Sequence, residues 1–242
     1  MIHLTHYRTA YSTTVELMDG QFPQKVHWFP ETYARVNTGM FYPPHRLAEK
    51  VLDPELVKSL RENRVGKTAF ILAGGNAHFA GINPRSKNPT RLSYEYKFLP
   101  FSLTQVYAGR TAQALGATDH IVTDATACAS SLKALMDVQT LINMYGFKRV
   151  IVLSVEDAVS NSVLDFFGEA RASLSQKDEE AGVLPSAFDD TNFGFRVGQG
   201  AVLAVFESDA QDPIATLKGA YTASEDHSNA IGQREDGQGF VR

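Results

Sequence analysis

The chain has 242 residues, of which 43% are hydrophobic, and a formal net charge of −4, as expected for a globular protein with one large domain or two small ones. The acidic balance gives no electrostatic reason to expect nucleic acid or a membrane surface as a partner. The N-terminus does not resemble a secretory signal, and no apolar run approaches the roughly 18–20 residues that cross a bilayer, so we expect a cytoplasmic protein.

Up to Gly116 the sequence predicts two helices and one strand. The stretch up to about Pro54 is rich in aromatic residues and prolines, which favour loops or short elements. Residues 54–62 predict a short helix with an apolar face. The apolar run 68–73 ends at a glycine pair and predicts a buried strand that runs into a loop. Residues 103–115 predict a second helix, because Gly116 follows as a C-cap.

The clearest unit of the sequence comes next. Residues 120–126 predict a strand, residues 130–145 a helix with an apolar stripe, and residues 148–154 a second strand. A strand, a helix and a strand with short joints form a βαβ unit, which implies parallel strands. The fold class is therefore predicted to be α/β.

The last third of the chain gives weaker signals. Residues 162–174 predict a helix and residues 201–206 a strand, whereas residues 214–223 show strand-like alternation at best. From Ser224 onwards the chain is polar and contains several glycines, so it predicts no element of its own. We therefore expect further sequence to belong after it.

Cys128 is the single cysteine, so an internal disulfide and a cysteine-rich zinc site are both excluded. One interpretation is a small buried hydrophobic residue. The other comes from its position at the turn between the predicted strand and helix, where open α/β sheets place their active sites. Its neighbours are small, as a tight turn that exposes a nucleophile requires. The helix dipole there favours a thiolate, and backbone N–H groups can stabilise an oxyanion.

The segment around this cysteine, T-D-A-T-A-C-A-S-S-L-K-A-L, resembles the active-site turn of β-ketoacyl synthases. Four other segments resemble the family in its order and at its spacing: F-L-P-F-S-L-T-Q-V-Y-A-G at 98–109, F-G-E-A-R-A-S-L-S at 167–175, A-F-D-D-T-N-F-G-F-R-V-G-Q-G-A at 187–201, and S-E-D-H at 224–227 with D-G-Q-G at 236–239. The resemblance covers residues 65–242 well and the first 60 residues poorly.

The resemblance implies the N-terminal half of a thiolase-like α/β fold, a mixed or parallel sheet covered by helices, without most of the second half. It divides the chain into an N-terminal ketosynthase-like domain at 1–210 and the start of the C-terminal half at 211–242. It implies an acyltransferase that forms an acyl-enzyme on Cys128 for decarboxylative Claisen condensation, as in fatty acid or polyketide synthesis. The expected partners are an acyl carrier protein or acyl-CoA, with the substrate on phosphopantetheine and no other cofactor or metal.

The resemblance also implies substrate-binding residues. By position, Asn76, Phe98 and Phe167 match residues that gate or line the acyl pocket, and His227 matches a histidine near the pantetheine entrance. Ordinary core packing is the alternative for the two phenylalanines, and a plain surface position is the alternative for His227. The family usually has an apolar side chain where Asn76 stands, and a polar gate suits a shorter or more polar acyl chain.

The chain also departs from the family. The two histidine motifs that activate the malonyl group, H-G-T-x-T and G-H-x-x-G-A, do not occur in it, and neither does the phenylalanine-glycine loop that supplies a second oxyanion donor. Gln199 replaces the usual acid, and Asn192 and Phe193 replace an arginine and an aspartate. The chain alone is therefore not expected to form carbon–carbon bonds.

Three hypotheses remain open. The chain is one part of a split or truncated ketosynthase, in a homodimer or in a heterodimer whose partner carries the histidines. Alternatively, it only accepts or transfers acyl groups through Cys128. In the third hypothesis it is a catalytically silent binding subunit, similar to chain-length factors, although those usually lack the cysteine.

Other chemistries fit the sequence less well. The glycine-rich stretch at 73–81 has neither the spacing of a dinucleotide site nor that of a phosphate loop. Asp189 and Asp190 have no surrounding ligand set for a metal. A cysteine hydrolase needs a histidine base beside Cys128, for which only His78 or His227 is a candidate.

Overall fold

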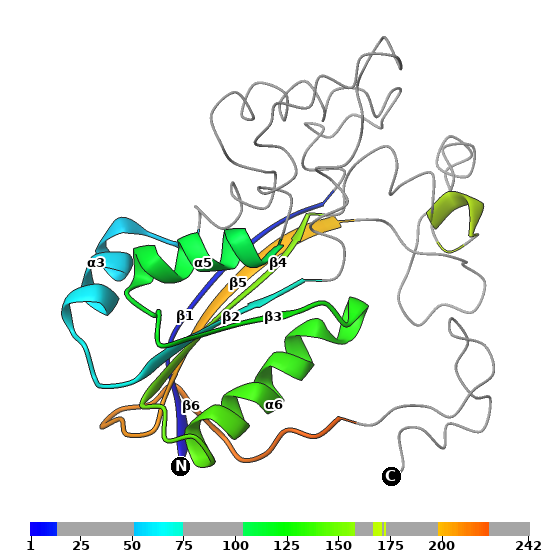
Figure 1. The fold of residues 1–242 in the computed structure, drawn as a ribbon. Helices are drawn as coiled ribbons and strands as arrows, with labels where there is room; N and C mark the ends of the chain where they lie inside the picture. Colours follow the sequence, from blue (N-terminus) through cyan, green and yellow to red (C-terminus); the bar gives the residue numbers. More distant parts are fainter. Residues whose placement is uncertain (14–50, 75–103, 158–166, 171, 173–197, 223–242) are drawn as a thin grey trace.

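A computed structural model of the chain describes residues 1–13, 51–74, 104–157, 167–170, 172 and 198–222. Within this part, six strands form one mixed sheet in the order β3-β2-β4-β5-β1-β6 (Figure 1). The strands are β1 (Ile2–Thr13), β2 (Thr68–Ala73), β3 (His120–Asp124), β4 (Arg149–Asp157), β5 (Gly198–Glu207) and β6 (Ala215–Leu217). The helices are α3 (Pro54–Glu62), α5 (Thr104–Leu115) and α6 (Ser130–Asn143), with a short 3₁₀ turn, η4 (Ala127–Ala129), before α6.

The predicted βαβ unit is present as β3, α6 and β4. Its two strands are parallel, as predicted, but they are not neighbours, because β2 lies between them and pairs in parallel with both. β5 pairs antiparallel with β4, and β1 pairs antiparallel with both β5 and β6, so the sheet is mixed. The α/β fold class is confirmed.

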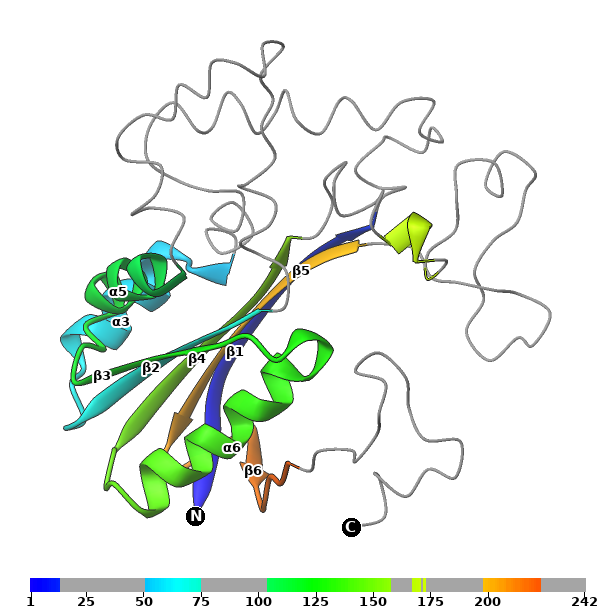
Figure 2. The ribbon, with the colours of Figure 1, turned by 45° about the vertical axis from the view of Figure 1, so that its right-hand side comes forward.

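Helices cover both faces of the sheet. α3 and α5 lie on one face and α6 on the other (Figure 2). β2 is buried along its whole length, because its side chains alternate between two apolar clusters. Phe70 and Leu72 pack towards α3 and α5, whereas Ala69 and Ile71 pack towards α6. The run of apolar residues at 68–73 is therefore explained by burial on both faces.

Most predicted elements agree with the structure to within a few residues. The helix expected at 54–62 has those bounds, and Asp53 caps it by accepting hydrogen bonds from the backbone N–H groups of Glu55 and Leu56 at 2.8 and 3.2 Å. The expected strand at 201–206 is longer, since β5 begins at Gly198. Of the expected helix at 162–174, only residues 167–170 and 172 are described, and 167–169 are helical.

The prediction of loops or short elements at the start of the chain is wrong for residues 2–13. These residues form β1, a strand of 12 residues between β5 and β6. The segment carries the β-branched and aromatic residues that strands favour, such as Thr5 and Tyr7. Its polar character fits its exposure, since only Ile2 is fully buried among residues 1–9. Residues 14–50 lie outside the described part of the chain.

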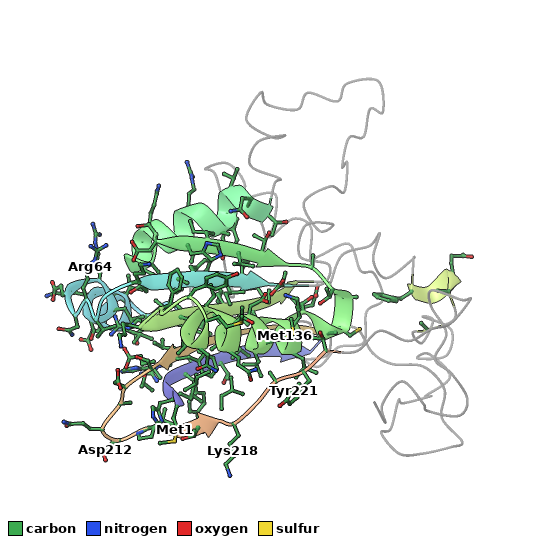
Figure 3. The ribbon with its side chains drawn as sticks, turned by 60° about the horizontal axis from the view of Figure 1, so that its bottom comes forward. Met1, Arg64, Met136, Asp212, Lys218 and Tyr221 are labelled. Atoms are coloured by element: carbon green, nitrogen blue, oxygen red, sulfur yellow. The ribbon has the colours of Figure 1, made fainter. Side chains whose placement is uncertain are left out.

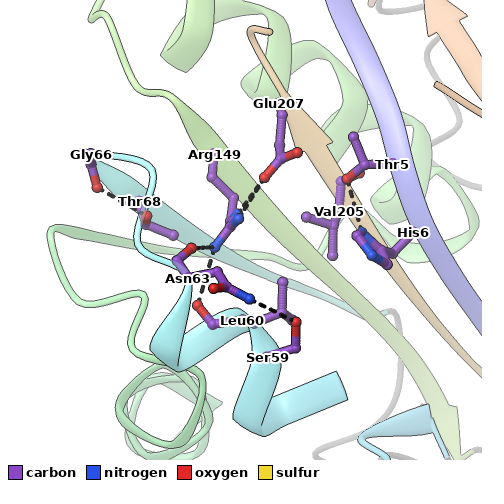
Figure 4. A network of polar contacts seen from close by, with 10 residues as sticks. All are labelled: Thr5, His6, Ser59, Leu60, Asn63, Gly66, Thr68, Arg149, Val205 and Glu207. Carbon is purple, nitrogen blue, oxygen red and sulfur yellow. Dashed lines mark hydrogen bonds and ion pairs between the residues drawn. The ribbon is translucent and has the colours of Figure 1, made fainter. Parts of the chain in front are cut away.

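A buried arginine joins α3 to the sheet (Figure 4). Arg149 at the start of β4 is only 5% exposed, and its Nη2 lies 2.6 Å from Oε1 of Glu207 at the end of β5. Its Nη1 donates hydrogen bonds to the carbonyl oxygens of Leu60 and Asn63, at 3.1 and 2.8 Å. Arg149 thus caps the C-terminus of α3 and neutralises a partly buried carboxylate.

The segment after β6 runs along α6. The backbone N–H of Ala220 donates to Oε1 of Gln139 at 2.9 Å, and the hydroxyl of Thr222 lies 3.2 Å from the sulfur of Met136. Figure 3 shows Tyr221 beside Met136 at this contact. Because Met136 is one helical turn before Gln139, the segment runs antiparallel to α6, towards the end that carries Cys128.

Candidate functional site

Cys128 lies in the turn that joins the C-terminal end of β3 to the N-terminus of α6. The backbone N–H of Gly74, which follows β2, donates to the carbonyl oxygen of Asp124 at 3.0 Å. The ends of the parallel strands β2 and β3 are therefore side by side at the edge of the sheet where Cys128 stands. This is the edge at which open α/β sheets bind their ligands.

The turn around Cys128 is held by one buried serine. Ser130 is 3% exposed, and its hydroxyl accepts a hydrogen bond from the N–H of Thr126 at 2.9 Å and donates to the carbonyl of Ala127 at 2.7 Å. The N–H of Ala129 also donates to the carbonyl of Thr126, at 3.1 Å. The three bonds close the chain into a compact loop directly before α6.

The backbone of the turn adopts a conformation that is uncommon for a residue with a side chain. Ala127 has a φ of +49°, in the left-handed region, which costs on the order of 1–2 kcal/mol for an L-residue. Such strain is found where a strand turns sharply into a helix to present a nucleophile. The small side chain of Ala127 limits the cost, because a branched side chain would clash there.

The thiol of Cys128 is free and exposed, so the alternative of a small buried hydrophobic residue is wrong. Within the described residues, the backbone N–H of Cys128 has no acceptor. Ala129, the N-cap of α6, also makes no side-chain capping bond. An exposed thiol, an available amide on the same residue and the positive end of a helix together form a place where a negative oxygen can be stabilised.

A charged cluster lies behind this turn. Nζ of Lys133 lies 2.6 Å from Oδ2 of Asp137 and 3.5 Å from Oδ1 of Asp124. Burial raises the pKa of Asp124 from 3.8 to about 6, the neighbouring carboxyl of Asp137 adds to the rise, and Lys133 opposes it. Partial burial lowers the pKa of Lys133, but the two carboxylates outweigh this and raise it overall, so Lys133 is charged.

The other predicted site residues are not brought to Cys128 by the described structure. Phe167 is half-buried in the helical segment 167–169, which is set apart from α6 in Figures 1 and 2. Its carbonyl accepts a hydrogen bond from the N–H of Ala172 at 2.9 Å. Asn76, Phe98 and His227 lie outside the described residues. Their roles in substrate binding stay predictions.

The histidines of the described part of the chain do not lie at Cys128. His120 begins β3, at the opposite end of that strand from the turn, and its ring is 5.9 Å from that of Phe147. His3 and His6 are on β1 and contact Thr216 and Thr5. Of these three imidazoles, none is beside the thiol as a general base. His78 and His227 lie outside the described residues.

The described residues hold neither a candidate metal site nor a candidate membrane span. They contain no group of three or more His, Cys, Asp or Glu side chains placed to hold a metal ion. None of their helices is long and apolar enough to span a membrane.

Comparison with known families identifies the chain. Residues 49–212 match the family model described as "Beta-ketoacyl synthase, N-terminal domain". The match includes β2, β3, α6, β4 and β5, and therefore the turn that carries Cys128. The chain belongs to the β-ketoacyl synthase family. A search of curated proteins finds no match to this β-ketoacyl synthase chain.

Solved ketosynthase structures resemble the fold. A type II polyketide ketosynthase, solved with its acyl-carrier protein and bound to a hexaketide, is similar at a TM-score of 0.55 and 17% identity, over 86% of this chain and 58% of that one. A chain from the complex of the ketosynthase ApeO with its chain length factor ApeC, from Xenorhabdus doucetiae, is similar at a TM-score of 0.47 and 15% identity, over 86% of this chain and 79% of that one.

A ketosynthase from module 6 of the bacillaene synthase of Bacillus subtilis 168 is similar at a TM-score of 0.48 and 18% identity, over 85% of this chain and 40% of that one. The first of the three similarities supports a ketosynthase-type, thiolase-like fold. The chain spans less than two thirds of both the polyketide and the bacillaene ketosynthases. The expectation that it represents the N-terminal part of such a protein agrees with the family match.

Sequence reasoning missed the supporting residues of the turn. It treated Ser130 only as a small neighbour, and it assigned no role to Asp124, Lys133 or Asp137. One signal was available: Lys133 and Asp137 have the i, i+4 spacing of a helical ion pair. Asp124 faces this pair because its side chain lies on the α6 side of β3. The sequence pattern did not show on which side of the strand it would lie.

Proposed function

We propose that Cys128 accepts an acyl group from a thioester and holds it as an acyl-enzyme for Claisen condensation of the fatty acid or polyketide type. The observation that carries the proposal is the exposed thiol of Cys128 in the β3–α6 turn, with its own N–H free within the described residues. The family match supports the reaction class.

The first step is an exchange of thioesters. The Cys128 thiolate attacks the carbonyl carbon of the incoming thioester, and the negative charge that develops on the carbonyl oxygen is stabilised by the Cys128 N–H and the start of α6. The tetrahedral intermediate collapses with cleavage of the bond to the carrier sulfur. The carrier thiol leaves with the proton that Cys128 gave up. No oxidant or metal is required for this exchange.

Condensation needs groups that this chain does not supply in its described part. The three histidines described there are distant from the thiol in the sheet topology, and the family's two histidine motifs are absent from the whole sequence. We therefore propose that a second chain brings the histidines. β3 ends the sheet of the described residues and leaves one strand edge unpaired there, which suits a partner chain.

An acyl carrier protein is the proposed donor, with acyl-CoA as the alternative. One structurally similar ketosynthase was solved with its acyl-carrier protein, which supports this choice of partner. A catalytically silent binding subunit is the second candidate, favoured by Gln199, which replaces the usual acid of the family. The exposed Cys128 argues against it, because an inactive subunit has no need of an accessible thiol.

The experiment is an intact-mass measurement of the purified chain after incubation with acyl-CoA or acyl-carrier-protein thioesters. We expect a mass gain of one acyl group in the native chain and none in Cys128→Ala. Ser131→Ala is the matched control, since Ser131 is exposed one residue beyond the turn, and it should acylate like the native chain. If no gain is seen while iodoacetamide still alkylates Cys128, the silent-subunit candidate replaces the proposal.

A further inference from the structure

Asp124 is a buried carboxylate with incomplete pairing. It is 9% exposed at the C-terminal end of β3, and its Oδ2 is buried without a hydrogen-bond partner among the described residues. Its other oxygen lies 3.5 Å from Lys133, at the limit of a hydrogen bond. A buried ionised carboxylate in this state is costly, whereas a protonated one carries a donor of its own.

The charges of the cluster do not balance when both acids are ionised. Lys133 contributes one positive charge and makes its short contact, 2.6 Å, with Asp137. Asp124 is then left with a long contact and an unpaired oxygen, so it is the carboxyl group that gains from a proton. A proton on Asp124 would give this group a donor for the neighbouring carboxylate of Asp137 and would make the cluster neutral.

We propose that Asp124 and Asp137 share one proton beside the charged Lys133, and that this pair is a pH-sensitive latch that holds the Cys128 turn against helix α6. A role of the latch in the reaction rests on the proposed function of Cys128. The latch itself does not require acylation. When the pH rises, the shared proton leaves to solvent, a second negative charge remains in the cluster, and the latch weakens.

The latch reaches the turn through the backbone. The carbonyl of Asp124 binds the N–H of Gly74, and its side chain faces the first two turns of α6 at Lys133 and Asp137. Only Ala125 separates Asp124 from Thr126, whose N–H is held by Ser130. Movement of Asp124 away from α6 therefore pulls directly on the loop that carries the thiol.

The other charged groups near Asp124 do not replace this pairing. β2, its neighbour in the sheet, carries no titratable residue. His120 is the other titratable group on the same face of β3, but it stands at the opposite end of the strand. α5 contacts β3 from the other face of the sheet and carries Arg110. Among the residues that the structure describes, Lys133 and Asp137 from α6 are thus the charged groups that face Asp124.

The first test observes the shared proton directly. In the ¹³C NMR titration of the aspartate carboxyl carbons, we expect the Asp124 signal, assigned by its loss in Asp124→Asn, to titrate with a midpoint near 6. In Asp137→Asn the midpoint should fall, because the repulsion and the carboxylate acceptor are both removed. A native midpoint near that of an ordinary aspartate overturns the proposal.

The second test follows the turn. Hydrogen exchange, corrected for the intrinsic pH dependence, should show several-fold less protection at the N–H groups of Thr126 and Ala129 at pH 7.5 than at pH 5. In Asp124→Asn, which stays neutral, this protection should not change with pH. Equal pH dependence in the two proteins overturns the latch.

A third readout concerns the thiol. We compare the rate at which iodoacetamide alkylates Cys128 in the native chain with the rate in Asp124→Asn. The ratio of native to variant rate should fall above pH 6, because the negative charge of ionised Asp124 disfavours the thiolate. A ratio that is constant across pH contradicts the link to Cys128. None of these readouts uses a thioester, so they distinguish failure of the latch from failure of the proposed acylation.

Discussion

The geometry around Cys128 depends on neighbours that take no part in the proposed thioester exchange. Ser130 closes the turn through its hydroxyl, and Ala127 provides the left-handed residue that lets the chain reverse before α6. Cys128 itself was predictable from the sequence, because it stands alone between a strand and a helix among small residues. The role of Ser130 was not, because any small residue fits the same pattern and only the structure shows where its hydroxyl points.

Replacing Ser130 tests this dependence. Ser130→Ala leaves the N–H of Thr126 without its partner, so we expect a loss of about 1–2 kcal/mol in the free energy of unfolding, measured by urea denaturation. The rate at which iodoacetamide alkylates Cys128 should also change as the turn loosens. Ser131→Ala, at an exposed site, should change stability by less than about 0.5 kcal/mol. Equal effects of the two substitutions would show that the serine hydroxyl does not hold the turn.

The raised pKa of Asp124 predicts how stability depends on pH. The folded chain binds the proton more tightly than the unfolded chain, so the stabilisation from this group is fully present below pH 4 and is lost as the pH rises through about 6. Relative to Asp124→Asn, the native chain should lose up to about 3 kcal/mol between pH 4 and pH 7.5, measured by urea denaturation at each pH. A native chain that gains stability over the variant as pH rises would contradict the assignment.

At the scale of elements, the sequence was most informative where periodicity and burial agree. The helix at 54–62 and the buried strand at 68–73 were predicted with their observed bounds, since an apolar stripe or a short apolar run identifies each. β1 was missed because its residues are largely exposed and its stability comes from pairing with β5 and β6, which are about 200 residues away along the chain. Local sequence patterns do not predict strand pairing between segments so far apart in the chain.

The Arg149 contact is the clearest link between elements that the sequence did not predict. Arg149→Ala leaves the Glu207 carboxylate and two carbonyl groups at the C-terminal end of α3 unpaired, so we expect a loss of about 3–5 kcal/mol in unfolding free energy. Lys148→Ala is the matched control, because Lys148 pairs with Asp209 at an exposed site, and it should cost less than about 1 kcal/mol. Similar losses from the two neighbours would contradict a structural role specific to Arg149.

At the scale of the whole molecule, the sheet order explains the position of Cys128, the proposed nucleophile. β2 lies between β3 and β4, so the turn after β3 stands beside the end of β2 and at one border of the described sheet. The sequence predicted the parallel strands but could not give this order, because a βαβ unit does not specify which strand enters between its two strands. The division at residue 210 stays a prediction, and β6, which lies beyond it, pairs with β1.

The central claim is that Cys128 forms a thioester with an acyl group, and the most direct measurement is the identity of the bond on its peptide. After loading from an acyl thioester, trypsin should release residues 111–133 with the mass of one acyl group added, and neutral hydroxylamine should remove it. Cys128→Ala should give the same peptide without an adduct. An acyl group found on another peptide, or an adduct that resists hydroxylamine, would contradict the account.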